Sequence, residues 1–409
     1  MTKKIKISMS GQILIAMILG IIIGLTFKSF SSNLKIVGDI FIKLIQMGII
    51  LLVMGQVIEA VGNIDLGQFG RMIRQTVIVF FTSSILAALW GAIMVIIFKP
   101  GLGISLKGLS NSGIKAGQSM SFSKVISDFF PSNIFESMSK GSIVQVIVFS
   151  IIFGIALSAF CHSTNEFQLL DIIKQFNQVI LKMISLIMKI APIGIFALIA
   201  SAIGKLGIKV IIPMMKYLVV YGFSTLTYLI FWILCITLVT KLSFVNLIKN
   251  MWDMSLMALA TTSSAVTFPT ELKDAKEKIG IKDKIAQIVL SLGMSLNSNG
   301  SAMHMSITII TIAQIYGIQY NLQTYMYIVL LATLASLANA VVPGAALVSL
   351  AIVIPQMGLP VESIALFAGV DWFVGMLRTI LNVDSDVFSS ILVAHKNNGI
   401  NTELFYKSN

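Results

Sequence analysis

One apolar stretch near the end of this 409-residue chain carries four ionisable side chains: Asp371, Arg378, Asp384 and Asp386. Its apolar flanks predict a membrane helix, and an ionisable group at bilayer depth costs roughly 2.5–3.5 kcal/mol on insertion scales. A helix tolerates that cost only where the charges face protein, water or a ligand. We therefore expect Arg378 to bind an anionic solute and the nearby carboxylate and amide oxygens to hold a cation.

The neighbours of Arg378 fit this expectation. Its guanidinium offers a fork of donors that matches a carboxylate. Thr379 is adjacent, Asn382 lies one turn later, and Asp386 follows Asn382 by four residues on the same helical face. The alternative is a structural ion pair between Arg378 and an aspartate that locks helices together. Asp371, two turns before Arg378, could likewise anchor the helix instead of binding anything.

A second polar point is the run Asn297, Ser298, Asn299, Gly300 and Ser301, which interrupts another apolar span. Asn and Gly are poor helix formers, so the helix should unwind here and expose backbone carbonyls. Hard cations such as sodium require several oxygen ligands, and interrupted membrane helices supply them. The run therefore predicts a cation site. The alternative is a kink whose polar groups bond to a neighbouring helix.

Weaker signals lie in two apolar regions with small and hydroxyl residues at their middle. Ser263 and Ser264 occupy one such point, and Asn339 with Pro343–Gly344 occupies the other. Hydroxyls and free amides at a helix end suit an anion. Serine pairs are also common in tight turns, so neither point identifies a site alone.

His304 follows the interrupted segment and has two interpretations. A histidine inside a membrane helix can relay protons. More often it is a hydrogen-bonded packing residue. The chain contains no H-E-x-x-H, G-x-S-x-G or P-loop motif, so an intramembrane or nucleotide-driven enzyme is not expected.

Composition places these residues in a multi-pass membrane protein. The chain is 56% hydrophobic and only 11% charged, with a mean hydropathy of +0.93. Its net charge of +12 comes mostly from Lys and Arg at segment ends, which indicates topology and lipid contact rather than nucleic-acid binding. Lys3, Lys4 and Lys6 predict a cytoplasmic amino end. Cys161 and Cys235 form no metal or disulfide motif.

Apolar windows predict an all-α membrane protein of about eight spans, at roughly 20 residues per span. The expected spans lie near 11–28, 38–61, 71–98, 143–161, 169–203, 209–242, 284–317 and 361–396. The polar stretch 99–140 predicts an external loop. Residues 246–278 and 323–358 contain Pro269 and Pro343 and are better explained as re-entrant helical hairpins, which survive at membrane depth only inside protein or beside water. The order of these elements along the chain is hairpin, broken span, hairpin, polar span. That order suggests inverted repeats with a binding site near the midplane.

Four motifs in this order, TTSSAVTFP, NSNGS, ANAVVPGA and RTILNVDSD, resemble those of the dicarboxylate/amino acid:cation symporter family, the glutamate transporter homologues. The resemblance covers nearly the whole chain. It implies a homotrimer in a bacterial inner membrane with both termini cytoplasmic, and an elevator-type transporter. The implied division is 1–70, scaffold helices 1–2; 71–100, transport-domain helix 3; 101–140, external loop; 141–206, scaffold helices 4–5; 207–245, transport-domain helix 6; 246–283, hairpin 1; 284–320, broken helix 7; 321–359, hairpin 2; 360–409, polar helix 8 and tail.

The resemblance also implies roles for individual residues. Arg378 would bind the substrate's distal carboxylate, while Ser264 and Asn382 would hold the other one. The remaining implied substrate-binding residues are Thr379, Ser263, Ser301, Val342, Gly344 and Gly375. One implied sodium site comprises Gly293, Asn297, Asn382 and Asp386; a second comprises Ser295, Ser336 and Ala338; a deep site would involve Asn299, Ser83 and Ser84.

Two departures from the family pattern bear on function. Asn299 stands where the family has an Asp, and Phe80 where sodium-coupled members have Tyr, so coupling would use fewer sodium ions or a proton. Gly375 stands where amino-acid-transporting members have an Asp that holds the substrate ammonium, which favours a C4-dicarboxylate. Thr379 follows the amino-acid pattern, so an acidic amino acid or another amino acid such as cystine remains an alternative.

The function expected from these residues is secondary active symport of a dianionic solute, driven by a sodium or proton gradient and without another cofactor. Two alternatives are an uncoupled anion conductance, in which the same polar helix lines a pore, and a non-transporting membrane sensor. The partners expected are therefore a small diacid or amino acid, sodium or a proton, lipid and two further copies of the chain, but no nucleic acid.

Overall fold

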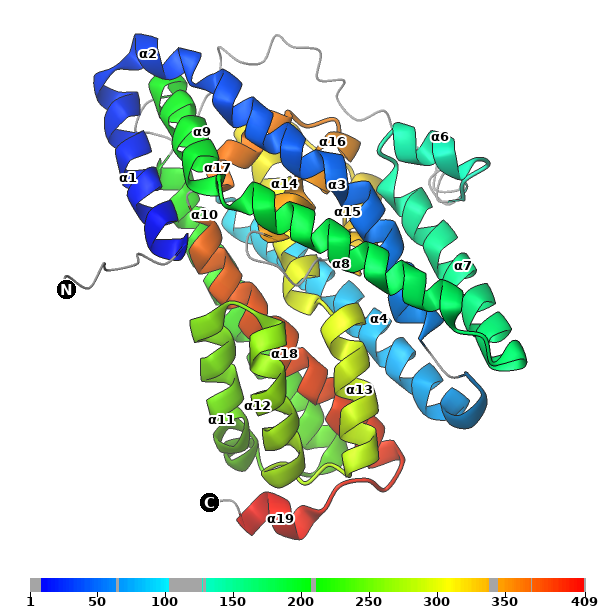
Figure 1. Ribbon diagram of the computed structural model, residues 1–409. Helices are drawn as coiled ribbons and strands as arrows, with labels where there is room; N and C mark the ends of the chain where they lie inside the picture. The colour runs from blue at the N-terminus through cyan, green and yellow to red at the C-terminus, as the bar shows by residue number, and fades with distance from the viewer. Residues whose placement is uncertain are drawn as a thin grey trace, which may run out of the picture.

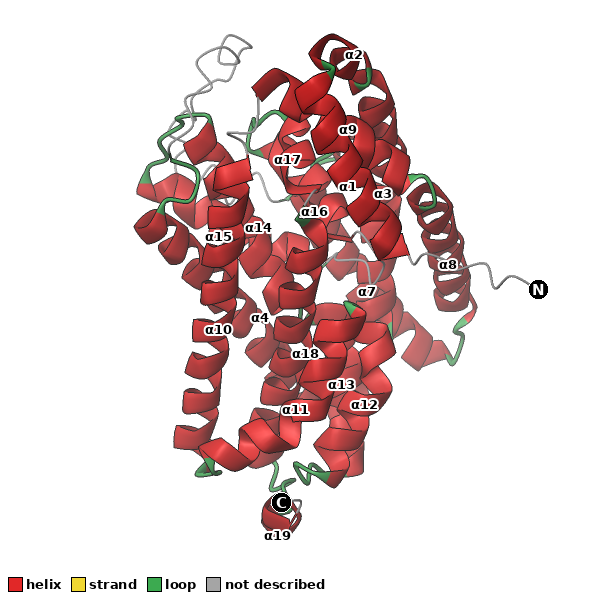
Figure 2. Ribbon diagram, turned by 90° about the vertical axis from the view of Figure 1, so that its left-hand side faces the viewer, coloured by secondary structure: helices red, strands yellow, loops and turns green. Residues whose placement is uncertain are grey.

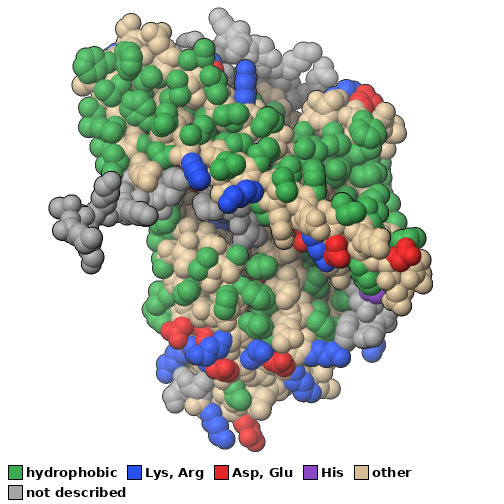
Figure 3. All heavy atoms as spheres, viewed as in Figure 1, with side chains coloured by type: hydrophobic (Ala, Val, Ile, Leu, Met, Phe, Trp, Pro, Cys, Tyr) green, Lys and Arg blue, Asp and Glu red, His purple; other side chains and the backbone are tan. Residues whose placement is uncertain are grey.

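The structure is a computed structural model that describes residues 9–63, 66–102, 127, 130–206, 211–337, 345–368 and 370–407. Every regular secondary-structure element in these ranges is a helix, apart from one isolated β-bridge between Ile281 and Ile400. The predicted all-α class is therefore confirmed. Apolar side chains cover much of the outer surface, while charged side chains gather at the end that carries α11–α13 and α19 (Figure 3). That distribution suits a protein surrounded by lipid.

One group of helices lies on the upper side in Figure 1 and comes from the first half of the chain: α1 (Met9–Thr26), α2 (Lys28–Asn33), α3 (Lys35–Gly62), α7 (Ile143–Thr164), α8 (Gln168–Met188) and α9 (Ala191–Leu206). α1 packs along α9, and α3 packs against α7, α8 and α9. Gly20 and Gly24 allow the close approach of α1 to α9, since a Cβ at either would lie within 2.9 Å of a carbonyl oxygen of α9.

The second group surrounds the polar helix: α4 (Leu66–Phe98), α10 (Ile211–Thr240), α11 (Phe244–Thr261), α12 (Ser264–Glu277), α13 (Asp283–Leu296), α14 (Asn299–Ile315) and α18 (Asp371–Lys396). Figure 2 shows α11, α12, α13 and α18 together at the end near the C-terminus. α18 contacts α10, α11, α13 and α14, and α14 packs along α4. Shorter helices complete the described chain: α6 (Ile134–Ser139), α15 (Leu322–Ser336), α16 (Ala345–Gln356), η2 (Val361–Ser363), α17 (Ile364–Ala368) and α19 (Thr402–Lys407).

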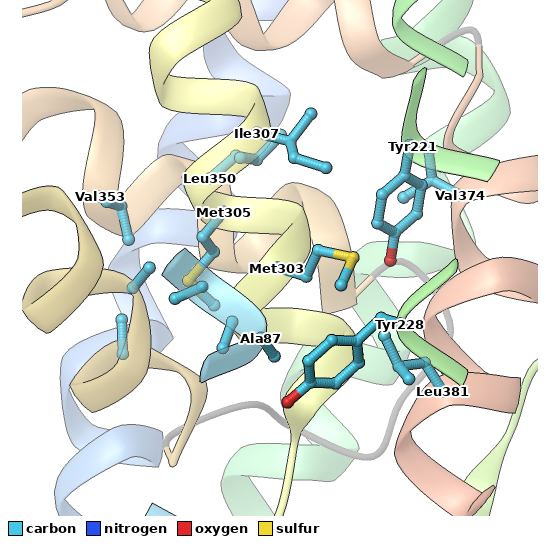
Figure 4. Packing of buried hydrophobic residues seen from close by; sticks show 14 of the residues in the cluster. Ala87, Tyr221, Tyr228, Met303, Met305, Ile307, Leu350, Val353, Val374 and Leu381 are labelled. Atoms are coloured by element: carbon cyan, nitrogen blue, oxygen red, sulfur yellow. The ribbon is translucent and has the colours of Figure 1, made fainter. Parts of the chain in front are cut away.

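α14 is the central helix of this group. Every residue in it except Gln314 is buried. Figure 4 shows Met303, Met305 and Ile307 of α14 among buried apolar side chains from α4, α10, α16 and α18. A helix that is buried on every side lies inside the protein and not on its lipid face. The polar residues at its start are therefore placed in the interior.

The region predicted as the first hairpin forms two antiparallel helices, α11 and α12. Asp274 Oδ2 accepts from Met254 N at 3.2 Å, and Thr261 Oγ1 lies 3.1 Å from Thr267 Oγ1 near the turn. The chain reverses at Thr262, which has a left-handed backbone conformation (φ 52°). Pro269 lies inside α12 and does not mark the turn. The reversal thus falls at the hydroxyl residues that precede the proline.

The base of this hairpin is held by Lys278. Its Nζ lies 2.6 Å from Asp253 Oδ2 and 2.9 Å from Asp274 Oδ1. Burial disfavours the charged form of Lys278, but the hydrogen bonds to the two carboxylates outweigh burial and raise the pKa of Lys278 above its ordinary value. The hairpin is therefore closed by a charge cluster at one end and a hydroxyl turn at the other.

Other expected elements fall partly outside the described residues. α15 and α16 contact each other as the second hairpin would require, but its tip, residues 338–344, is not described. Ala338, Asn339, Val342, Pro343 and Gly344 therefore lie outside the described residues, as do Lys3, Lys4 and Lys6. The segment predicted as a loop over 99–140 contains α6, which Asn133 caps by accepting from Phe135 N at 2.9 Å.

In the part of the chain that is described, four helices are long and apolar enough to cross a membrane, or five if the bent pair α8 and α9 counts as one span. The other three expected spans are not long and apolar enough as single helices, for physical reasons. The described apolar part of α1 is short, α13 and α14 are separated by Asn297 and Ser298, and α18 carries four charges before its last turn. The total of about eight spans stays a prediction.

Candidate functional site

The buried guanidinium of Arg378 is the centre of the candidate site. Its side chain is 6% exposed, and Nη1 has no hydrogen-bond partner among the described residues. No described carboxylate lies within 4.0 Å of it, so the structural ion pair considered above is not found in this part of the chain. A buried cationic donor without a partner costs free energy unless a ligand satisfies it. Arg378 is therefore available for an anion.

The start of α14 packs directly on the backbone of Arg378. A Cβ on Gly300 would overlap the carbonyl group of Arg378, so only glycine allows this approach. Asn382 Oδ1 accepts a hydrogen bond from Gly300 N at 2.8 Å, and Tyr221 of α10 donates to the carbonyl oxygen of Gly300 at 3.1 Å. The first amides of a helix have no intrahelical partner, and Asn382 satisfies one of them. The NSNGS interruption is thereby joined to the polar helix.

The hairpin turn reaches α18 one turn before Arg378. A Cβ built on Gly375 would lie 3.8 Å from Thr262 Cβ, with nothing closer. Ser263 caps α12 by accepting from Val266 N at 3.4 Å, and Ser264 is the first residue of that helix. The start of α12 therefore faces the same end of the site as Arg378. Thr379, the residue after Arg378 in α18, and Ser301, the residue after Gly300 in α14, are both buried.

The predicted sodium ligands Gly293, Asn297 and Asp386 lie together. Asn297 Nδ2 donates to Asp386 Oδ1 at 2.8 Å, and a Cβ on Gly293 would lie 2.6 Å from the same oxygen. Asp386 is 1% exposed and has no basic group within 4.0 Å among the described residues. A buried carboxylate of this kind needs a positive partner. The oxygens of these groups and of Asn382, one turn away, form a donor set that suits a hard cation.

The residues of the expected deep site also meet. Asn299 Oδ1 accepts from Ser84 Oγ at 2.8 Å and from Ser83 Oγ at 3.2 Å, while Ser83 Oγ also lies 2.9 Å from the carbonyl oxygen of Phe80. Asn299 Nδ2 has no partner among the described residues. The cluster contains hydroxyl, amide and carbonyl groups but no formal charge.

The remaining predicted cation ligands are not assembled in the described structure. Ser295 is exposed, and Ser336 donates to the carbonyl oxygen of Thr333 at 2.7 Å. No hydrogen bond joins the two serines in the described structure, and Ala338 lies outside it.

Sequence reasoning missed Glu271, the third carboxylate of a buried acidic cluster. Glu271 is on α12, is 1% exposed and has no partner for Oε1 among the described residues. It is close enough to Asp386 and Asp384 for their charges to interact, and Asp384 accepts from Ser255 of α11 at 2.7 Å. No local signal marks Glu271, because it lies among Lys273, Asp274 and Lys276 in the charged half of α12, where an acidic residue is ordinary.

Comparison with known proteins identifies the family of this chain. Residues 9–396 match the model of the sodium:dicarboxylate symporter family. The chain belongs to this family. The transporter is 31% identical over 391 residues to the proton/glutamate-aspartate symporter of Bacillus subtilis (strain 168), covering 94% of this chain and 93% of the relative.

Two further relatives have names that cover two kinds of substrate. The transporter is 31% identical to the proton/glutamate-aspartate symporter of Escherichia coli (strain K12), over 96% of this chain and 93% of the relative. It is 29% identical to the C4-dicarboxylate transport protein of Bacillus subtilis (strain 168), over 95% and 93%. The protein is therefore a multi-pass membrane transporter and not an enzyme, and its family includes both kinds of carrier.

Proposed function

We propose that this transporter takes up a C4-dicarboxylate together with a coupling cation. One carboxylate of the substrate binds Arg378, and the other lies toward Ser264 and the first turn of α12. The observation that carries the proposal is the buried, unpartnered Nη1 of Arg378. Bidentate pairing with a carboxylate would satisfy this donor, and a charge-assisted hydrogen bond contributes roughly 1.5–3 kcal/mol.

Gly375 supports a substrate without an ammonium group. The position one turn before Arg378 has no side chain, and the nearest atom to a Cβ there belongs to Thr262. A substrate ammonium at this end of the site would find no carboxylate from residue 375. Glutamate or aspartate is the second candidate, because two relatives of this chain are named glutamate-aspartate symporters.

The coupling cation would be a sodium ion held by Gly293, Asn297, Asn382 and Asp386. The uncompensated buried charge of Asp386 supports this assignment. The site is surrounded by α4, α10, α11, α12, α13, α14 and α18, which supports a moving unit distinct from the scaffold of α1–α3 and α7–α9. We propose that this unit carries the substrate by an elevator motion within a homotrimer.

Uptake by proteoliposomes tests the proposal. Purified protein should accumulate labelled succinate against its gradient when sodium or protons are higher outside. Arg378→Lys keeps the charge but loses the fork of donors, so it should reduce apparent affinity by at least about tenfold. The exposed Arg74→Lys is the matched control. If neither succinate nor aspartate accumulates under either gradient, the proposal is wrong. Flux that follows only the anion's own gradient would favour an uncoupled conductance.

A further inference from the structure

His304 is a buried titratable residue that the proposed substrate and sodium sites do not use. It lies in α14, one turn after Gly300, and is 1% exposed. Its Nδ1 has no hydrogen-bond partner among the described residues. A hydrogen-bonded packing histidine would have both ring nitrogens satisfied. The free Nδ1 instead leaves a position where a proton can bind.

Two tyrosines of α10 pack against the imidazole. Ring centroids of Tyr221 and Tyr217 lie 5.7 and 6.5 Å from that of His304. Their hydroxyls are already engaged with α14, at the Gly300 carbonyl oxygen (3.1 Å) and at Thr308 Oγ1 (2.9 Å). Figure 4 shows Tyr221 beside Val374 of α18 and across from Met303 of α14. These rings exclude bulk water, so the charge state of His304 depends on the few charges nearby.

Arg378 is the charge that acts most directly on His304. The two groups interact electrostatically, and the guanidinium also acts on Tyr217 and Tyr221. Asp371 of α18 faces the same cluster, since it interacts with Tyr217 and Arg378. Among the other helices that pack on α14, α15 and α16 have no ionised residue, α4 has none after Arg74, and α10 carries only Lys216, which is exposed. α15 contributes only the tyrosines Tyr325 and Tyr327.

A bound dianion changes the balance of charge around His304. Before binding, a proton on His304 would place a second positive charge beside the buried Arg378, which is unfavourable at low effective dielectric. A C4-dicarboxylate lowers the charge of the site by two, and one added proton restores half of that change. Aspartate, with its ammonium group, lowers the charge by only one. Proton binding should therefore be linked to the dicarboxylate more strongly than to aspartate.

We propose that His304 is a proton-binding residue of this transporter, which takes up a proton from water when a dicarboxylate binds at Arg378 and releases it when the dicarboxylate leaves. The N–H bond forms at Nδ1, giving an imidazolium beside Tyr217 and Tyr221. No other bond changes. The inference rests on the proposed function, because it requires a dianion at Arg378, and it assigns a proton as a coupling ion of that site.

Calorimetry on the full-length protein in lipid nanodiscs tests this linkage. Succinate is titrated at constant sodium in buffers of different ionisation enthalpy, so that the heat reports the protons taken up. We expect net uptake of on the order of one proton per succinate, and a Kd that rises by up to about tenfold per pH unit where the linkage operates. His304→Gln should bind succinate with no proton uptake and little dependence on pH.

The chain offers matched controls. It has only three histidines, and the other two, His162 and His395, are exposed. The double variant His162→Gln/His395→Gln should keep the wild-type proton uptake. Asp371→Asn tests the rival acceptor: if it abolishes uptake while His304→Gln retains it, the proposal is overturned. Succinate binding without proton uptake in the wild type overturns the role of His304 but leaves the proposed function intact. Failure of both succinate and aspartate to bind instead overturns the proposed function.

Nuclear magnetic resonance of the wild-type protein gives a test that no folding defect can obscure. Protein labelled with nitrogen-15 in histidine has three imidazoles, and His162→Gln and His395→Gln assign the exposed pair by elimination. The His304 nitrogens should show a neutral ring without substrate and an imidazolium with saturating succinate. A ring that stays neutral when succinate is bound refutes the proposal.

Discussion

Gly375→Asp should move the preference of the transporter from a dicarboxylate toward aspartate. A Cβ at residue 375 meets nothing closer than Thr262 Cβ at 3.8 Å, so a Cβ fits there without backbone movement. The introduced carboxylate would lie one turn before Arg378, within the region expected to receive a substrate ammonium. Because α18 is helical here, replacing glycine adds no conformational strain.

Two contacts of the new carboxylate set the magnitude, and both favour aspartate over succinate. A charge-assisted hydrogen bond between the new carboxylate and the ammonium of aspartate contributes roughly 1.5–3 kcal/mol, which corresponds to about 10- to 150-fold in affinity. The same carboxylate also competes with succinate for Arg378 at i, i+3 spacing, which weakens succinate binding. The ratio of the succinate Kd to the aspartate Kd should therefore increase by at least about tenfold.

The assay is equilibrium binding of succinate and aspartate to the purified protein at saturating sodium. Gly375→Asn is the matched control, since it has nearly the same size but no charge. A Kd ratio that does not change, or that changes equally in the asparagine variant, would refute the charge argument. In that case substrate selection would not depend on residue 375, and the case for a dicarboxylate would lose its main support.

Three further substitutions test the cation sites and the close contact at Arg378. Asp386→Asn removes the only formal charge from the proposed sodium site. The sodium concentration that gives half-maximal substrate binding should therefore rise by at least about tenfold, while the pH dependence of binding persists. Asn299→Asp adds a negative ligand beside the Ser83 and Ser84 hydroxyls, so the sodium concentration dependence should become steeper; an unchanged slope would argue against a latent deep site. Gly300→Ala places a methyl group against the Arg378 carbonyl. Thermal unfolding should therefore show a free energy of unfolding lower by about 1–3 kcal/mol, together with loss of transport. A wild-type unfolding curve would contradict the tight packing.

Local sequence determined much of this transporter. Long apolar stretches predicted the helices, because a membrane helix must satisfy its own backbone within one continuous segment. The breaks were equally local: Asn297 and Ser298 end one helix and begin the next, and the hydroxyl residues before Pro269 form the turn of the first hairpin. The free energy cost of a charge in lipid singled out Arg378 without any knowledge of its neighbours.

Contacts between helices were decided only by the tertiary structure. Ser84 and Asn299 are 215 residues apart in sequence, yet their side chains lie 2.8 Å apart. Glu271 meets Asp386 because of the way α12 packs against α18. His304 meets two tyrosines because of the way α14 packs against α10. Hydrophobicity along one segment reports that the segment lies in the membrane, but the residue that each side chain meets is set by the rotation and crossing of two separate helices.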